Sequence, residues 1–313
     1  MIGEIRRILL LPHIKVHNAN ALSSPFTIGF PAMTAWLGAV HAIQRKVNGS
    51  FLKGVLFSRG AVISHSLDLH TYKGPDDFIF SIIGTGNPLV EKKKRKKGEP
   101  WEQFERPAFI EEARCHLDVS LLIEYSGINK DDEKGLIEQV AHHLNASIKI
   151  AGGDILSFQE PRLYRIEEGN DNELRALTRK LMPGYAIIER RELMIDAMQQ
   201  GQDALDALID YLAIQNRCER DYAGNVTWTS HRKTSGWIVP IATGFHGISE
   251  LGPAKNQRDP DTPHRFAESV VTLGEFRMPH RIHSLNEILW SYHTDLEKNL
   301  YLCQQKSRNE LTE

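Results

Sequence analysis

The sequence predicts an α+β fold whose N-terminal half is a ferredoxin-like or RRM-like core. The first half reads strand, helix, strand, strand, helix, strand, and a dense basic run interrupts that order. From about residue 161 the hydrophobic pattern becomes less regular. We therefore expect a core over residues 1–160 with a basic arm inserted at about 85–113. Residues 161–313 are expected to form a mixed α/β C-terminal extension that packs on this core.

Hydrophobic spacing defines the elements of the first half. Ile5–Val16 is strand-like, and Pro12 restricts it to an edge, a bulge or a bend. A helix over 31–47 follows, with Trp36 assigned to the core, and then strands at Val55–Leu69 and Phe78–Ile83. Beyond the basic run come an alternating strand at Leu117–Tyr125, a helix after three acidic residues at 131–133, and a strand at Ile148–Ile150 that Gly152 and Gly153 end.

The second half carries weaker signals. Leu174, Leu177 and Leu181 predict a short helix, and a longer helix is expected over 191–214. Trp237–Ile241 and Val270–Phe276 read as strands. Ser284 and Glu287 have the spacing of a capping box, which predicts a final helix carrying Leu285, Ile288, Leu289, Tyr292 and Leu296.

The composition of the 313 residues is typical of a soluble globular protein, with 25% charged and 41% hydrophobic residues. The net charge of −2 gives no global nucleic-acid signature, so any such binding must use a local patch. Three widely spaced cysteines, Cys115, Cys218 and Cys303, favour reduced thiols in a cytoplasmic protein over disulfides or a zinc site. No apolar run reaches 18 residues, so no membrane span is expected.

A polar loop between the first strand and the first helix is the most informative stretch. It holds Asn18, Asn20, Ser23 and Ser24, whose side chains both donate and accept hydrogen bonds. The helix start that follows offers free backbone N–H groups, which suit a phosphate or a nucleotide edge. Spacing alone favours an ordinary capped connection, and neither a Gly-x-Gly-x-x-Gly motif nor a Walker lysine is present.

Four runs resemble one family. Residues 9–31 and 37–45, the segment 237–249 and the turn 276–281 are similar to the second subunit of the Csy complex, the type I-F CRISPR surveillance assembly. This family is of the Cas-five type of RAMP protein. The resemblance implies a RAMP core with a thumb-like insertion and a non-catalytic role in antiviral defence. In that role the chain holds the five-prime handle of the guide RNA together with the large subunit, while a different subunit cleaves the guide.

Under this hypothesis Asn18, Asn20, Ser23 and Ser24 contact base edges or the sugar–phosphate of an unpaired strand. Phe30 either stacks on a base or is buried in the core. Phosphate contacts are assigned to Arg277 and Arg281, and a second loop to Phe245 and His246. Arg45 and Lys46 end the first helix, where a solvated terminus competes with a phosphate contact. The expected partners are guide RNA, the large subunit, an adjacent backbone subunit and target DNA; no metal or cofactor is expected.

The basic run comprises Lys92, Lys93, Lys94, Arg95, Lys96 and Lys97. Six like charges repel and extend, so a solvated loop is the general expectation. In a chain of net charge −2, an arm that lies on phosphates is the functional alternative, and it would give salt-sensitive affinity.

A metal-independent ribonuclease on the same fold is the alternative function. His13, His17 and His41 lie near the polar loop and would have to supply the general base. Nothing in the sequence shows that they converge. There is no His-Glu-x-x-His and no Cys-x-x-Cys, so no catalytic or metal residue is assigned.

Overall fold

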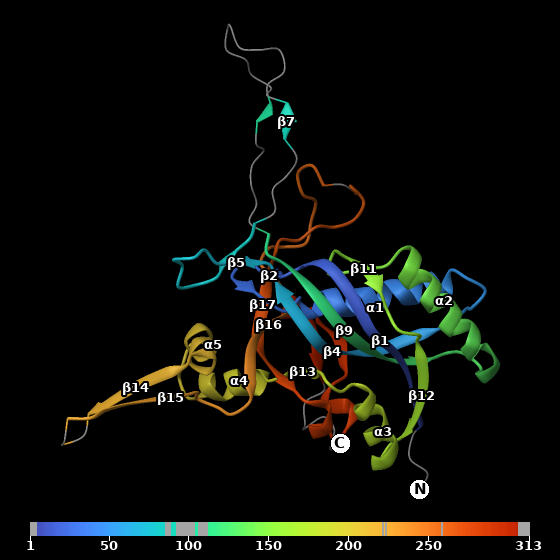
Figure 1. The fold of residues 1–313 in the computed structure, drawn as a ribbon. Helices are drawn as coiled ribbons and strands as arrows, with labels where there is room; N and C mark the ends of the chain where they lie inside the picture. Colours follow the sequence, from blue (N-terminus) through green and yellow to red (C-terminus); the bar gives the residue numbers. More distant parts are fainter. Residues whose placement is uncertain are drawn as a thin grey trace, which may run out of the picture.

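The computed structural model describes residues 5–84, 89–91, 104–105, 112–220, 222, 224–257 and 259–305. These residues form an α+β protein with one large antiparallel sheet (Figure 1). The helices are α1 Met33–Asn48, α2 Glu133–Ala146, α3 Asp171–Lys180, α4 Arg191–Gln199 and α5 Ala204–Leu212. Short 3-10 turns lie at Lys130–Asp132, Pro279–Arg281 and Leu285–Glu287.

The large sheet has eleven strands in the order β10-β11-β1-β9-β4-β13-β17-β16-β19-β18, and β12 also pairs with β1. Its strands are β1 Ile5–Asn20, β4 Leu56–Leu69, β9 Arg114–Ser126, β10 Lys149–Ile150, β11 Gly153–Ser157, β12 Arg162–Glu167, β13 Tyr185–Glu189, β16 Trp237–Gly247, β17 Ala267–Arg277, β18 Trp290–Asp295 and β19 Leu300–Gln305. Four separate two-stranded pairs are β2 Leu22–Ser24 with β3 Thr27–Ile28, β5 Thr71–Tyr72 with β6 Ser81–Ile82, β7 Val90–Glu91 with β8 Phe104–Glu105, and β14 Gln215–Arg220 with β15 Val226–His231.

The N-terminal strands lie together in the sheet, but the strand expected at Ile148–Ile150 is the two-residue β10, and a further strand, β11, begins at Gly153, where the sequence predicted an end. β11, β1, β9 and β4 lie side by side, each antiparallel to its neighbour. Alternating apolar residues of β1 and β9 point to two different cores. Of the three alternatives expected at Pro12, the structure has the bulge, because the register between β1 and β9 shifts between Leu11 and Ile14. His13, inside this bulge, has a φ of 48°.

Two layers cover the sheet. The apolar sides of α1 and α2 pack on one face in the larger core cluster, which includes Trp36 with no exposed surface. Leu174 and Leu177 of α3 pack with Leu285 on the other face, over Ile8 and Leu10 of β1. Beyond the core cluster under α3, the strands β1, β9 and β4 carry polar side chains such as His13, Asp118 and His65. The candidate site lies there.

The sheet joins the two halves of the chain. β13 pairs with both β4 and β17, and β18 returns to β4 through the pairing of Trp290 with Gly60. The strands β4, β13, β17, β16, β19 and β18 therefore form a closed circuit. Glu124 accepts hydrogen bonds from the Nε atoms of Arg6 and Arg59, at 2.6 and 2.8 Å, and both guanidinium groups also donate to Asn286 Oδ1. Arg6 and Asn286, 280 positions apart, thus belong to one hydrogen-bonded network around the Glu124 carboxylate.

Three predicted elements are wrong. Only Ser81–Ile82 of the stretch 78–83 is a strand, and Phe78, Ile79 and Phe80 are exposed rather than buried. The helix expected over 191–214 is two helices, because Gly201 between α4 and α5 has a φ of +97° that ends the first one.

The predicted final helix is a single 3-10 turn followed by the hairpin β18–β19. Ser284 does accept the Asn286 N–H, and Glu287 accepts the His283 N–H. The capping contacts therefore exist, but strand pairing with β4 and β19 replaces further helical turns.

The basic run Lys92–Lys97 lies outside the described residues. Cys115 and Cys303 are buried free thiols, and Cys218 is exposed. Among the described residues, no helix has the length and apolar character needed to cross a bilayer.

Candidate nucleic-acid interface

The polar loop folds into a tight hairpin, β2–β3, directly after β1. Thr27 Oγ1 lies 2.9 Å from Ser23 Oγ and 2.6 Å from Ser24 Oγ, and Asn20 Oδ1 accepts the Leu22 N–H at 3.0 Å. Ser24 is buried, whereas Asn20 is exposed. These bonds give the loop a fixed shape, and they leave Ser23 half-buried at its surface. Part of the predicted hydrogen-bonding capacity is therefore used within the loop.

A cavity of about 320 Å³ lies between this hairpin and the C-terminal half. The hairpin side contributes Ser23, Thr27 and Phe30, and β4 contributes polar residues that include His65 and Ser66. The opposite wall is aromatic and is formed by Tyr185, Trp237 and Phe276, with Val239 and Pro240 beside them. The site is therefore built from segments more than 150 residues apart in the sequence.

The aromatic wall is continuous. The Trp237 ring lies 5.2 Å from Tyr185 and 5.1 Å from Phe276, and Phe276 lies 5.3 Å from Phe30. Trp237 is 51% exposed, while Phe30 is 8% exposed and stacks on Trp36. Phe30 thus belongs to the core floor of the cavity, and Trp237 is the ring available to a ligand. An apolar cavity with a few polar groups at its edge is typical of a small-ligand or base site.

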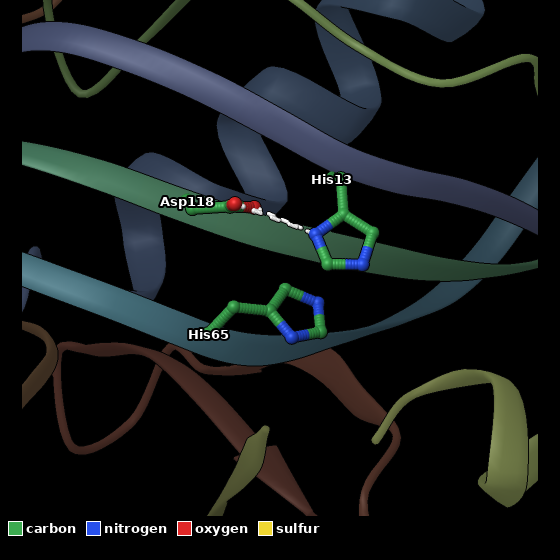
Figure 2. A group of neighbouring side chains, drawn as sticks. All are labelled: His13, His65 and Asp118. Carbon is green, nitrogen blue, oxygen red and sulfur yellow. Dashed lines mark hydrogen bonds and ion pairs between the residues drawn. The ribbon is translucent and has the colours of Figure 1, made fainter. Parts of the chain in front are cut away.

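His65 links this cavity to a polar cluster on the sheet, shown in Figure 2 with His13 and Asp118. His13 Nδ1 lies 3.1 Å from Asp118 Oδ1, and the His13 and His65 rings stack with centroids 4.1 Å apart. Ser120 Oγ connects the two residues, because it accepts the His13 backbone N–H and lies 2.7 Å from His65 Nε2. His13 belongs to the β1 bulge, and it joins this network from there.

The donor set of this cluster is of a metal-binding type, since the three ligand atoms lie within 4.8 Å of one another. The geometry of the rings fits a hydrogen-bond network better. His65 Nδ1 lies 2.6 Å from the Pro183 carbonyl and Nε2 bonds Ser120, so both ring nitrogens have partners. Two stacked rings, inclined by only 23°, direct their lone pairs side by side rather than at one point.

A second histidine cluster lies further along the same strands. His17 stacks on His116 at 4.4 Å, and His116 Nε2 lies 3.0 Å from His70 Nε2. Asn18, at a φ of 57°, donates its backbone N–H to His116 Nδ1. Burial lowers the pKa of both His65 and His116, and neighbouring imidazoles lower it further. His65 and His116 are therefore mainly neutral hydrogen-bonding groups near pH 7.

Comparison with known proteins places the chain in a family. The profile described as CRISPR-associated protein (Cas_Csy2) matches residues 9–303. The chain belongs to the Csy2 family. A relative named CRISPR-associated protein Csy2, from Pseudomonas aeruginosa (strain UCBPP-PA14), is 33% identical over 326 aligned positions that cover 94% of each chain. The family resemblance of the N-terminal and C-terminal runs, to the second subunit of the type I-F Csy complex, is thereby confirmed.

The other residues predicted to bind RNA lie in this Csy2-family chain at three separate places. Arg45 and Lys46 are in the last turn of α1, about 18 Å along the helix from its start near the loop. Phe245 and His246 are on β16, on the order of 17 Å along the strand from Pro240 at the cavity. The structure does not bring these four residues to the cavity.

Arg277 and Arg281 flank the aromatic wall at the end of β17. Arg277 bonds both oxygens of Glu275 and lies 3.5 Å from Glu287, so its charge is already paired. Arg281 is exposed in the following 3-10 turn. Of the two, Arg281 is the freer candidate for a phosphate.

Sequence reasoning missed His65, His70, His116 and Asp118. The signal for two of them was present, because His116, Asp118 and Ser120 alternate with the apolar residues of a strand that was recognised. Whether these residues lie on the same face of the sheet as His13 depends on the bulge between Leu11 and Ile14. The spacing of residues in the sequence does not reveal this bulge. His41, in contrast, lies exposed on α1.

Proposed function

We propose that this chain is a non-catalytic RNA-binding subunit of a type I-F CRISPR surveillance complex. It holds the five-prime handle of the guide RNA together with the large subunit, in the cytoplasm, and contributes to antiviral defence. Membership of the Csy2 family supports the assignment to this assembly. An adjacent backbone subunit and target DNA are the further partners proposed for it.

The strand order supports the fold part of this proposal. A ferredoxin-like core arranges its strands as fourth, first, third and second, all antiparallel. β11, β1, β9 and β4 have that order, with α1 and α2 as the connecting helices on one face. We accordingly propose a RAMP core over residues 1–160, a thumb-like arm at about 85–113 and an extension over 161–313.

The cavity beside the polar hairpin is the observation that carries the RNA-binding proposal. Sequence-specific recognition of single-stranded RNA uses unstacked bases that lie on aromatic rings and bond polar edges. Trp237, Tyr185 and Phe276 supply the rings, and Ser23, Ser66 and His65 supply hydroxyl and imidazole groups. We propose that one base of the handle enters here, that Asn18, Asn20 and Ser24 shape or contact the adjoining nucleotides, and that Arg281 and the run Lys92–Lys97 bind phosphates.

Replacing Trp237 by Ala tests this function directly. Stacking of one base on an aromatic ring is worth about 1–3 kcal/mol, so we expect on the order of tenfold weaker binding of a handle RNA, measured by fluorescence anisotropy. Adding Asn20→Ala and Ser23→Ala should weaken it further. Trp228→Ala is the matched control, because Trp228 is also a largely exposed tryptophan but lies on β15. Equal affinity of the Trp237 and Trp228 variants would count against the cavity as the RNA site.

One observation favours a second candidate, a metal-independent ribonuclease. Asp118 holds His13 through Nδ1, which leaves His13 Nε2 as a general base in the manner of a carboxylate–histidine pair. Incubation of the purified chain with repeat RNA separates the two functions. Specific cleavage that His13→Ala abolishes would favour the enzyme, and RNA binding without cleavage would favour the structural subunit.

A further inference from the structure

Two neighbouring helices, α4 and α5, leave apolar side chains facing outward. Ile195 and Met198 on α4 are 46% and 47% exposed, and Leu205 and Ile209 on α5 are 62% and 53% exposed. The spacings of three and four residues place each pair on one side of its helix. We call these four residues the α4–α5 apolar face. Both helices lie on the same side of the large sheet's C-terminal strands (Figure 1).

α5 is apolar on two sides, which distinguishes it from an ordinary surface helix. Its inner side, with Leu208, Tyr211 and Leu212, packs on Met194, Ile238 and Leu273. Leu205 and Ile209 extend this apolar stripe to the outer side of the helix, and the charged Asp206 and Asp210 lie on the same helix. A surface helix normally needs an apolar stripe only on the side that packs on the core, so the exposed part of this wider stripe is not explained by packing within the chain. The outer side of α5 therefore has the composition of a surface that another molecule covers.

Acidic residues surround this face. Residues 191–214 contain five acidic side chains and one arginine, a local charge of −4 in a chain whose net charge is −2. Lys233 pairs with Asp210 at 3.2 Å, and Glu192 pairs with Arg190. Within the described part of the chain, no ion pair is recorded for Asp196 or Asp206, and both are exposed. The apolar face thus has an acidic rim with uncompensated charge.

This charge decides among the molecules that might cover the face. A nucleic-acid backbone would be repelled by the rim. A second copy of this chain, related by a two-fold axis, would bring one acidic rim against the other, and like charges across an interface oppose association. A protein surface with an apolar centre and a basic rim is complementary in both respects.

We infer that the α4–α5 apolar face docks another protein subunit of the assembly, one that presents an apolar patch rimmed by lysine or arginine. The inference rests on the proposed function, because it takes its partner from the same CRISPR complex. It assigns α4 and α5 to protein contact and leaves the cavity at Trp237 to RNA. Because Leu205 and Ile209 are outward-facing, polar replacements there remove partner contacts without removing core packing.

Co-expression with the other subunits of the complex and a guide RNA tests the inference. Leu205→Ser combined with Ile209→Ser should reduce recovery of the full-length chain in the assembly roughly tenfold or more, since a few well-packed residues at the centre of an interface carry most of its binding free energy. The matched control is Leu156→Ser with Leu296→Ser, which removes two other exposed leucines, 68% and 82% exposed, and should assemble normally. The thermal midpoint of the isolated chain should be the same for both double variants.

A second variant tests the charge argument. Asp196→Lys with Asp206→Lys should also reduce recovery of the chain in the assembly. Added salt should make the recovery of this variant and of wild type more similar, because salt screens the charges. Normal assembly of the Leu205/Ile209 variant would overturn the inference while leaving the proposed function intact. Failure of the wild-type chain to join the assembly would instead overturn the proposed function, and the inference with it.

Two further results would also overturn the inference. A wild-type dimer that the Leu205/Ile209 variant abolishes would show that a second copy covers the face. A loss of handle-RNA affinity in the isolated variant, with assembly unchanged, would show that the face binds RNA.

Discussion

Glu189 is a buried acid whose pKa in the folded chain lies above its usual value. Its side chain is 5% exposed at the end of β13, and it accepts the Gln305 backbone N–H at 3.0 Å. Burial raises the pKa of Glu189 to about 7, and Arg191 at 3.9 Å lowers it only in part. The folded state therefore holds a proton between pH 4.5 and 7 that the unfolded chain has released.

The sign of the pH dependence follows from this difference. The protonated Glu189 carboxyl contributes to the free energy of unfolding. This contribution is fully present below pH 4.5 and is lost as the pH rises through 7. Glu189→Gln keeps an oxygen acceptor and removes the ionisation. We expect the variant to have a free energy of unfolding about 1–3 kcal/mol higher than wild type at pH 8, with little difference near pH 4.5, by urea denaturation. Exposed Glu250→Gln is the control, and a pH-independent difference for Glu189→Gln would contradict the explanation.

Only some residues of the candidate site could be predicted from the sequence. The polar character of the loop at Asn20 and Ser23 was visible in the sequence. The aromatic wall was not, because Trp237 and Phe276 were read as strand residues within runs that resemble the family, with no stacking role assigned to them, and Tyr185 had no signal. These three rings come to the hairpin through the pairing of β4 with β13 and of β13 with β17, which are long-range contacts.

At the scale of elements, glycine decides where α4 ends. The N–H of Gly201 bonds the Met198 carbonyl, and the N–H of Gln202 bonds the Ala197 carbonyl, which is the pattern of a glycine-terminated helix. Gly201 has a φ of +97° and no neighbouring atom within 4 Å of an added Cβ. A side chain at Gly201 would therefore cause no steric clash, and its cost would come from the unfavourable backbone conformation alone.

Gly201→Ala should consequently lower the free energy of unfolding by about 1–2 kcal/mol, because L-residues rarely adopt this conformation. Gly38→Ala provides the opposite case. Gly38 lies inside α1, also with free space around a Cβ, and alanine is the better helix former by about 1 kcal/mol. Thermal unfolding of both variants measures the effects. Stabilisation by Gly201→Ala would show that the turn between α4 and α5 does not require glycine.

Helices and strands were predicted correctly where the periodic apolar residues are also the ones that the core buries. The strand at Leu117–Tyr125 and the helix at Glu133–Ala146 each bury one periodic set of side chains. It failed at the C-terminus, where Leu285, Ile288 and Leu289 have helical spacing but pack from a 3-10 turn at Leu285–Glu287 and the two residues after it. Trp290 then pairs with both Gly60 and Gln305, so tertiary strand pairing overrides the local pattern.

At the scale of the whole molecule, Trp290 closes the circuit of strands. It has no exposed surface, donates its Nε1–H to the Ile187 carbonyl at 3.0 Å, and pairs with Gly60 of β4. Space at Gly60 is limited, because a Cβ there would lie 3.2 Å from a Leu37 methyl group. Trp290 therefore joins strands from both halves of the chain, through its indole to β13 and through its backbone to β4.

Trp290→Ala should lower the free energy of unfolding by about 3–5 kcal/mol, the usual cost of removing a large buried ring. Because β4 belongs to both halves of the sheet, we expect one transition in which circular dichroism and tryptophan fluorescence coincide. Trp290→Phe, which keeps an aromatic ring but loses the indole donor, should cost less. Two separate transitions in the alanine variant would mean that residues 1–160 unfold independently of the extension.

The closed circuit of strands also constrains synthesis on the ribosome. β18 and β19 are the last described elements to leave the exit tunnel, yet β4, translated some 230 residues earlier, needs β18 as a neighbour. During elongation the nascent chain exposes one edge of β4, which is a site for misfolding and for recruitment of chaperones. The circuit closes only after β18 has been made, so truncation of the chain before Trp290 should yield insoluble product.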